Sequence, residues 1–112
     1  MDCIFCKIAA GEIPSTRVFE NEWVVAFRDL NPQAPTHILV IPREHIASAD
    51  GVNADNSAVI AKIFEAIPQI AKAEGLTGGY RVITNCGPDA CQSVHHLHFH
   101  LLGGAQLADR MA

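Results

Sequence analysis

The most informative segment of the sequence reads Ser93-Val94-His95-His96-Leu97-His98-Phe99-His100-Leu101-Leu102. Successive side chains of a β-strand point to opposite faces, so residues two apart share a face. A strand here would place His96, His98 and His100 on one face and apolar side chains on the other. Three imidazoles would bring no gain to a purely structural strand, because each loses water and charged rings repel one another. We therefore predict a functional site on this face.

The chemistry of this site has more than one interpretation. Imidazole can ligate a metal, act as an acid or base near neutral pH, or attack as a nucleophile. A three-histidine zinc face is one interpretation, although no carboxylate general base lies nearby in the sequence. A phosphate site is the other, with Asn85, Ser93 and amides of the 85–92 loop as donors. Periodicity alone does not choose between them. His95 falls on the apolar side, and we expect it to be packed and hydrogen-bonded.

The rest of the sequence predicts short strands and one short helix. Alternating apolar residues and turn residues predict strands at Arg17–Glu20, Trp23–Arg28, His37–Ile41, Tyr80–Thr84 and Ser93–Leu102. A short helix should begin at a cap on Asp2, run to about Ala10 and stop at Gly11.

A second, longer helix is predicted from Asn53 or Asp55 to Glu74. Its apolar residues recur three and four apart, at Ile60, Ile63, Phe64, Ile67, Ile70 and Ala71. Pro68 lies within this pattern and should kink the helix without abolishing it. The short strand connections before the helix predict antiparallel neighbours. The predicted fold class is α+β, one domain over residues 1–112 with a five-stranded, mainly antiparallel sheet.

Composition narrows the class of protein. The chain has 112 residues, of which 49% are hydrophobic and 18% charged, which suits one folded domain and disfavours disorder. Eight Lys and Arg against twelve Asp and Glu give a net charge of −4, which argues against a nucleic-acid partner. No apolar run approaches the roughly 18 residues of a membrane span. Met1-Asp2-Cys3 lacks the pattern of a secretory signal, so we expect a cytoplasmic protein.

The four cysteines are expected to be thiols in that compartment. Cys3-Ile4-Phe5-Cys6 is a C-x-x-C motif, which suits a metal site or a redox pair. No predicted strand precedes it, which disfavours the redox interpretation. Two buried thiols on a helix face explain the motif as well as a metal site does. Zinc would need two more ligands, which His45 or the histidine cluster could supply. Cys86 and Cys91 are interpreted as small loop residues.

Two motifs resemble the histidine-triad (HIT) family. The segment His96–Leu102 is similar to the family signature His-φ-His-φ-His-φ-φ, where φ is apolar. Its flanks, Gln92-Ser93-Val94 and Leu102-Gly103-Gly104, resemble the Hint branch of nucleoside phosphoramidases. So does Asp29-Leu30-Asn31-Pro32-Gln33-Ala34-Pro35-Thr36-His37-Ile38-Leu39-Val40-Ile41-Pro42. The resemblance covers about residues 3–104, and the tail 105–112 departs from it. Cys91 also departs, because it stands where a glycine is common.

The resemblance implies a catalytic set. His98 would be the nucleophile that attacks the α-phosphorus, giving a nucleotidyl-histidine that water hydrolyses. The other implied members are His100 on the phosphate, Ser93 near the leaving group, His37 as a fourth histidine, and His96, whose carbonyl orients the nucleophile.

The resemblance also implies binding residues. The nucleotide would contact Asp29 at the ribose, with Asn85, Ser93, His98 and His100 at the phosphate. Candidates for the base pocket are Ile4, Phe5, Ile8, Phe27 and Leu30, which could equally be plain core. Cys3, Cys6, His45 and His96 match a structural zinc site, and no catalytic cofactor is expected.

The function implied is hydrolysis of purine nucleoside 5′-phosphoramidates and adenylated amines. The expected ligand is an AMP- or GMP-type purine nucleotide, and the expected assembly is a homodimer. One alternative is a dinucleoside polyphosphate hydrolase of the same family. Others are a nucleotide-binding interaction protein with vestigial catalysis and a metal-sequestering protein that uses the histidine strand.

Overall fold

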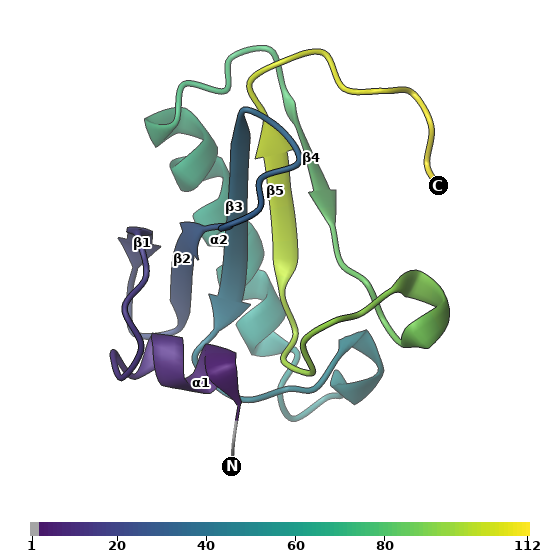
Figure 1. Ribbon diagram of the computed structural model, residues 1–112. Coiled ribbons are helices and arrows are strands. Elements are labelled where there is room, and N and C mark those ends of the chain that lie inside the picture. The colour runs from purple at the N-terminus through teal and green to yellow at the C-terminus, as the bar shows by residue number, and fades with distance from the viewer. Residues whose placement is uncertain (1–2) are drawn as a thin grey trace.

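A five-stranded sheet forms the centre of the computed structural model, which describes residues 3–112 (Figure 1). The helices are α1 (Ile4–Ala9) and α2 (Ala58–Ala73), with 3-10 turns η1 (Ala49–Gly51) and η2 (Pro88–Ala90). The strands are β1 (Arg17–Glu20), β2 (Val24–Arg28), β3 (Thr36–Pro42), β4 (Tyr80–Ile83) and β5 (Phe99–Gly103). Their order is β1-β2-β3-β5-β4, and every neighbouring pair is antiparallel. The predicted α+β class is confirmed.

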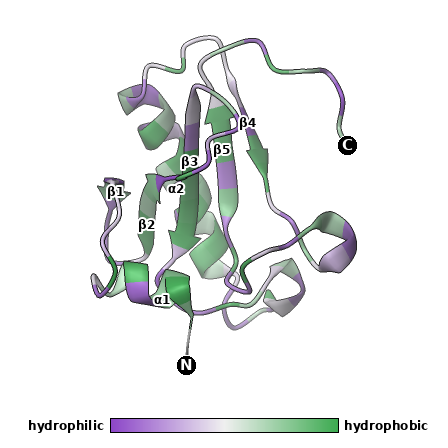
Figure 2. Ribbon diagram, viewed as in Figure 1, coloured by the Kyte–Doolittle hydropathy of each residue, from purple (hydrophilic) through white to green (hydrophobic). Residues whose placement is uncertain are grey.

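Each face of the sheet buries its own apolar cluster. Even-numbered residues of β2 and β3, such as Val24 and Ile38, pack with α2 on one face. Odd-numbered residues, such as Val25 and Ile41, pack with α1 on the other. Strands buried on both faces read as continuous apolar runs, as in β2 and β3 (Figure 2). The side chains of α1 and α2 are therefore separated by the sheet.

Helix α2 starts later than predicted, at Ala58 instead of Asn53 or Asp55. The Asn53 side chain accepts from the N–H groups of Asp55 and Asn56, and this local turn competes with helix there. The helix ends at Ala73, one residue before the predicted Glu74, and contains Pro68. Its buried residues are Val59, Ile63, Ala66, Ile67, Ile70 and Ala71. Phe64, predicted for this stripe, is half exposed, although its ring still contacts that of Phe99.

The histidine segment is a strand only from Phe99 onward, so the prediction of a strand from Ser93 to Leu102 was too long. The ladder with β3 ends at Val40 and Phe99, and Leu97 donates instead to the Ile46 carbonyl of a loop. The predicted alternation persists nonetheless, since Leu97, Phe99 and Leu101 enter the core beneath α2. His95 is exposed, which overturns the prediction that it is packed.

Cys3 is the N-cap of helix α1, and Asp2, which was predicted as the cap, lies outside the described residues. The Cys3 Sγ accepts from the Cys6 N–H at 3.3 Å. The helix stops before Gly11, whose φ of +79° is a left-handed conformation that glycine adopts without strain. Within residues 3–112 we find no helix with the length and apolar character of a membrane span.

Candidate active site and metal centre

Three histidines meet on the α1 face of the sheet. His100 on β5 is paired with Leu39 on β3, which makes His37 its diagonal neighbour across the ladder. The His37 Nε2 and His100 Nδ1 atoms are 2.8 Å apart. The rings of His98 and His100 are 5.1 Å apart between centroids. The structure therefore brings together three of the residues that the sequence predicted, from segments more than 60 positions apart.

Backbone contacts fix the orientation of His98. Its Nδ1 lies 2.7 Å from the His96 carbonyl oxygen, and because a carbonyl only accepts, Nδ1 carries the proton. The neutral ring therefore has its lone pair on Nε2. The Thr84 hydroxyl donates to the His98 carbonyl at 2.8 Å, and the edge-on ring of Phe5 lies 5.1 Å away between centroids. His98 is buried, and its Nε2 is the nitrogen left free of this backbone contact.

The surroundings of His37 and His100 favour the neutral form of both rings. Burial, together with the neighbouring His98 and His37, lowers the pKa of His100 to about 4, and Asp29 opposes this shift. Burial also lowers the pKa of His37, again against the effect of Asp29. The Asp29 carboxylate is 3.5 Å from His37 Nε2. At neutral pH both rings are uncharged and can accept or donate one hydrogen bond at each nitrogen.

A cavity of about 200 Å³ lies beside Asp29. Phe5, Phe27 and Leu30, three of the candidates for the base pocket, line it. Ile8 is buried in the apolar cluster under α1, and Ile4 is half exposed; neither lines this cavity. The lining residues that sequence reasoning missed are Pro14, Ser15, Thr16, Arg28 and Leu39.

Ser15 is unusual among these lining residues. Its Oγ is the one buried side-chain oxygen or nitrogen without a hydrogen-bond partner in residues 3–112. Buried polar atoms normally have partners, so this hydroxyl is a candidate for binding something that enters the cavity. The sequence predicted only a loop at Glu12–Ser15, and no local signal distinguished this serine.

The predicted phosphate-side residues lie on the loop that enters β5. Asn85 is half-buried and Ser93 is exposed, and neither side chain makes a hydrogen bond within residues 3–112. The Gln92 side chain holds this loop, since its Oε1 accepts from the Gly87 N–H and its Nε2 donates to the Ala47 and Val94 carbonyls. Among the described residues, no hydrogen bond joins the Asn85 or Ser93 side chain to the histidines.

A second cluster gathers Cys3, Cys6, His45 and His96. The His96 Nδ1 is 3.3 Å from the Cys3 Sγ, 3.5 Å from the Cys6 Sγ and 3.2 Å from the His45 Nδ1. The Cys6 Sγ is 3.3 Å from the His45 Nδ1. Four ligands of a tetrahedral zinc ion would lie roughly 3.3–3.8 Å from one another. The donor set and its spacing therefore fit structural zinc.

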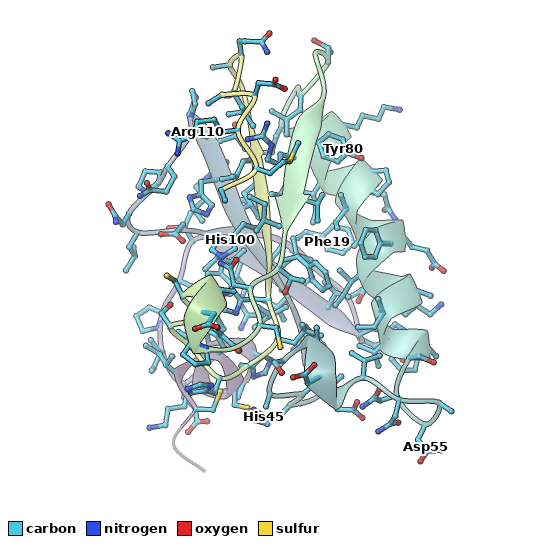
Figure 3. All side chains as sticks on the ribbon, turned by 90° about the vertical axis from the view of Figure 1, so that its right-hand side faces the viewer. Phe19, His45, Asp55, Tyr80, His100 and Arg110 are labelled. Carbon is cyan, nitrogen blue, oxygen red and sulfur yellow. The ribbon has the colours of Figure 1, made fainter. Side chains whose placement is uncertain are left out.

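The His96 ring is oriented for such a role. Its Nε2–H donates to the buried Pro42 carbonyl at 2.9 Å, which leaves the Nδ1 lone pair directed at the thiols. Burial lowers the pKa of His96, and this hydrogen bond partly opposes the shift. His96 also connects the two sites, because its side chain joins the cysteine cluster and its carbonyl holds His98. Figure 3 shows His100 higher along the sheet than His45.

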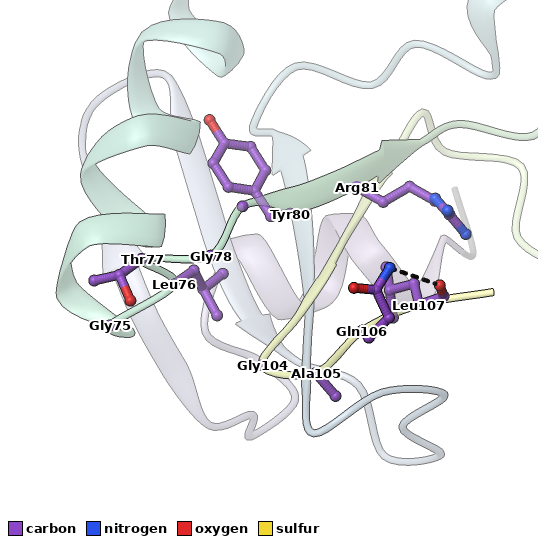
Figure 4. Close-up of a pocket in the computed structure, with 11 residues that line it drawn as sticks. Gly75, Leu76, Thr77, Gly78, Tyr80, Arg81, Gly104, Ala105, Gln106 and Leu107 are labelled. Carbon is purple, nitrogen blue, oxygen red and sulfur yellow. Dashed lines mark hydrogen bonds between the residues drawn. The ribbon is translucent and has the colours of Figure 1, made fainter. Parts of the chain in front are cut away.

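A larger cavity, of about 460 Å³, lies elsewhere, between residues 75–81 and 104–107 (Figure 4). It contains no histidine, cysteine or carboxylate. The tail beside it is held by Arg81, which donates to the Ala108 carbonyl at 2.8 Å. The histidine cluster lies instead beside Asp29, which lines the smaller cavity.

Comparisons with known proteins find a matching family and relatives over most of the chain. The family described as "Scavenger mRNA decapping enzyme C-term binding" matches residues 2–111. The 14 kDa zinc-binding protein of Zea mays is 49% identical over 106 residues, covering 93% of this chain and 83% of its own. The adenylylsulfatase HINT1 of Arabidopsis thaliana is 44% identical over 106 residues, covering 93% and 72%.

Solved structures are equally similar. A HIT family hydrolase from Clostridium thermocellum superposes with a TM-score of 0.96 at 46% identity, covering 99% of this chain and 97% of its own. A histidine triad protein from Clostridium difficile has a TM-score of 0.95 at 50% identity, covering 98% and 96%.

The sheet, the three clustered histidines and the cavity beside them define the class of histidine-triad proteins. The chain belongs to the HIT family and has Hint-like relatives. Together these findings support a HIT nucleotide hydrolase.

Proposed function

We propose that the protein hydrolyses purine nucleoside 5′-phosphoramidates and adenylated amines to a nucleoside monophosphate and a free amine. The observation that carries the proposal is the fixed orientation of His98. A buried imidazole whose Nδ1–H donates to a backbone carbonyl at 2.7 Å directs its Nε2 away from that contact, as a nucleophile requires.

In this mechanism, His98 Nε2 attacks the α-phosphorus and the phosphorus–nitrogen bond breaks. The amine leaves with a proton, for which the Ser93 hydroxyl is the candidate donor. Water then attacks the phosphorus of the nucleotidyl-histidine, the phosphorus–Nε2 bond breaks, and the proton that the water loses restores the Ser93 hydroxyl, which regenerates the enzyme. His100 and His37, which are in contact at 2.8 Å, would stabilise charge on the phosphoryl oxygens.

The binding roles follow from the same surroundings. The purine would enter the cavity between Phe5 and Phe27, and the ribose hydroxyls would reach Asp29 at its edge. Asn85 would contact the phosphate from the loop before β5. Zinc held by Cys3, Cys6, His45 and His96 would be structural, because none of these four residues lines the cavity.

The decisive experiment measures AMP release from an adenosine 5′-phosphoramidate. His98→Ala should abolish turnover, with a loss of at least about 10³-fold, because no other group can form the covalent intermediate. His95→Ala is the matched control, since that histidine is exposed on the same segment, and it should retain wild-type rates. Unchanged turnover in His98→Ala would contradict the mechanism.

A substrate panel separates the alternatives. Adenylyl sulfate belongs in it because a 44%-identical relative is called an adenylylsulfatase, and its cleavage would use the same nucleotidyl-histidine. A dinucleoside polyphosphate tests the remaining hydrolase alternative. Faster turnover of either compound than of the phosphoramidate would reassign the substrate. AMP binding without turnover of any of them would indicate a binding protein.

We also propose that the protein acts as a homodimer. Strand β4 lies at the edge of the sheet with one neighbour, and the aromatic side chains of Phe64 and Tyr80 are 50% and 42% exposed. Light scattering should give twice the monomer mass for the wild type. Phe64→Glu should reduce it to the monomer mass, whereas Trp23→Glu, at an equally exposed aromatic, should not.

A further inference from the structure

The loop between β2 and β3 places one backbone donor on the histidine cluster. The Gln33 N–H donates to His37 Nδ1 at 3.0 Å. Prolines occupy positions 32 and 35, so only Gln33 and Ala34 have amide hydrogens in this stretch. The loop is held from the other side, because Asp29 Oδ1 accepts from the Asn31 N–H at 2.7 Å and Gln33 Nε2 donates to the Asn31 carbonyl at 3.0 Å.

This donor determines where the proton of His37 lies. A backbone amide can only donate, so His37 Nδ1 must accept and the single proton of the neutral ring is on Nε2. If His37 were doubly protonated, its Nδ1–H would point at the Gln33 N–H, and two donors would face each other without an acceptor. Burial of the ring likewise favours its neutral form.

The constraint continues to the next ring. His37 Nε2–H lies 2.8 Å from His100 Nδ1 and 3.5 Å from an Asp29 oxygen. With that proton directed at it, His100 Nδ1 accepts, and the proton of neutral His100 is on its Nε2. The titratable groups that face His100 are His98 on the same segment, His37 on β3 and Asp29 after β2.

We propose that the Gln33 backbone amide is a positioning group that sets the tautomers of His37 and His100, so that His100 presents an Nε2–H donor to the phosphoryl oxygens. The role of His100 toward the phosphoryl oxygens rests on the proposed function, whereas the tautomer assignment rests only on the hydrogen bonds of the structure. One face of the sheet then offers a lone pair at His98 and a proton at His100, and both are fixed by backbone groups. The nucleophile and the oxyanion donor are thus distinguished before substrate binds.

The direct test is a long-range ¹H–¹⁵N NMR spectrum of the wild-type protein at neutral pH without nucleotide. His37 and His100 should each carry their proton on Nε2, and AMP should shift the His100 Nε2–H signal. A proton on His37 Nδ1 would overturn the proposal. The absence of a proton on His37 Nε2 would also overturn it. A cation held among Asp29, His37 and His100 would produce that result.

Two substitutions at one position separate the amide from the side chain. Gln33→Pro removes the N–H, and we expect both rings to exchange between tautomers and kcat/KM to fall about 10- to 100-fold. Gln33→Ala keeps the N–H and should retain the wild-type tautomers. Wild-type tautomers in Gln33→Pro would overturn the proposal.

These measurements separate the two proposals from each other. If Gln33→Pro does not fold, the wild-type spectrum alone decides the tautomers. A wild type with the expected tautomers that turns over no phosphoramidate would contradict the proposed function and leave the tautomer assignment intact.

Discussion

At the scale of single residues, three histidines of the two clusters are oriented by backbone groups. His96 donates to the Pro42 carbonyl, His98 donates to the His96 carbonyl, and His37 accepts from the Gln33 amide. Neutral imidazole has two tautomers, and one fixed partner selects between them. Three chemically identical side chains can therefore have different roles on one face of a sheet.

Ser15 gives a prediction in which stability and binding change in opposite directions. Its buried hydroxyl has no partner in residues 3–112, and leaving such a group unpaired costs about 1–3 kcal/mol. Ser15→Ala should therefore raise the free energy of unfolding by about 1 kcal/mol and weaken AMP binding. Urea unfolding and calorimetric titration measure the two effects. Lower stability with unchanged AMP affinity would contradict a ligand-binding role for this hydroxyl.

The histidine cluster also predicts how stability depends on pH. Folding lowers the pKa of His100 from 6.5 to about 4, so between these values the unfolded chain binds more protons than the folded one. The contribution of His100 to the free energy of unfolding is therefore complete above about pH 6.5 and is lost as the pH falls toward 4. Urea unfolding of wild type and His100→Asn at pH 7, 5.5 and 4.5 should give a shallower dependence for the variant. The same slope in both would contradict the assignment.

At the scale of elements, the loop before β5 is shaped by backbone conformation. Gly87 has a φ of +83° and Cys91 a φ of +61°, and Cys91 is the one non-glycine residue in the left-handed region within residues 3–112. Glycine, which the resemblance implies at position 91, adopts this conformation without strain. A side chain there costs about 1–2 kcal/mol.

Replacing this residue should relieve the strain. Cys91→Gly should stabilise the protein by up to ~1 kcal/mol, because the higher chain entropy of unfolded glycine offsets part of the gain. Cys91→Ala is the matched control, since it removes the thiol but keeps the Cβ, and it should give no such gain. Thermal unfolding of the three proteins measures the difference. Equal stabilisation in both variants would point to the thiol as the cause.

At the scale of the whole molecule, the cysteine cluster joins distant parts of the chain. The Cys3 and His96 side chains are in contact although 93 positions separate them. Cys6 comes from α1, and His45 follows β3. A zinc ion at this point would connect α1 to the sheet beside the histidine site.

Removing zinc should therefore lower stability. Binding to the folded state alone contributes about 4 kcal/mol when free zinc is 1,000 times its Kd. We expect a chelator, or Cys3→Ser, to lower Tm by several degrees in calorimetry. Cys86→Ser, at a thiol outside the cluster, should keep both zinc and Tm. Full zinc content in Cys3→Ser, measured by elemental analysis, would argue against this ligand set.

The sequence by itself determined the α+β class, the approximate strands, the alternation of the histidine segment and the resemblance to HIT proteins. These follow from local periodicity and short motifs, which depend on neighbours along the chain. The sequence-based prediction misplaced the starts of α2 and β5 and the burial of His95. The Asn53 side-chain turn delays the start of α2, and the end of the ladder with β3 sets the start of β5.

Only the tertiary structure decided which groups meet. The contact of His37 with His100, the clustering of Cys3 and Cys6 with His45 and His96, and the cavity at Ser15 join segments that are remote in the sequence. The tautomers of His37, His96 and His98 also depend on tertiary contacts, because backbone N–H and carbonyl groups fix them. Such groups are present in every chain, so no sequence pattern reveals which of them will face a histidine. Side-chain pattern predicts which chemistry is present, whereas the direction of each hydrogen bond exists only once the sheet and its loops have formed.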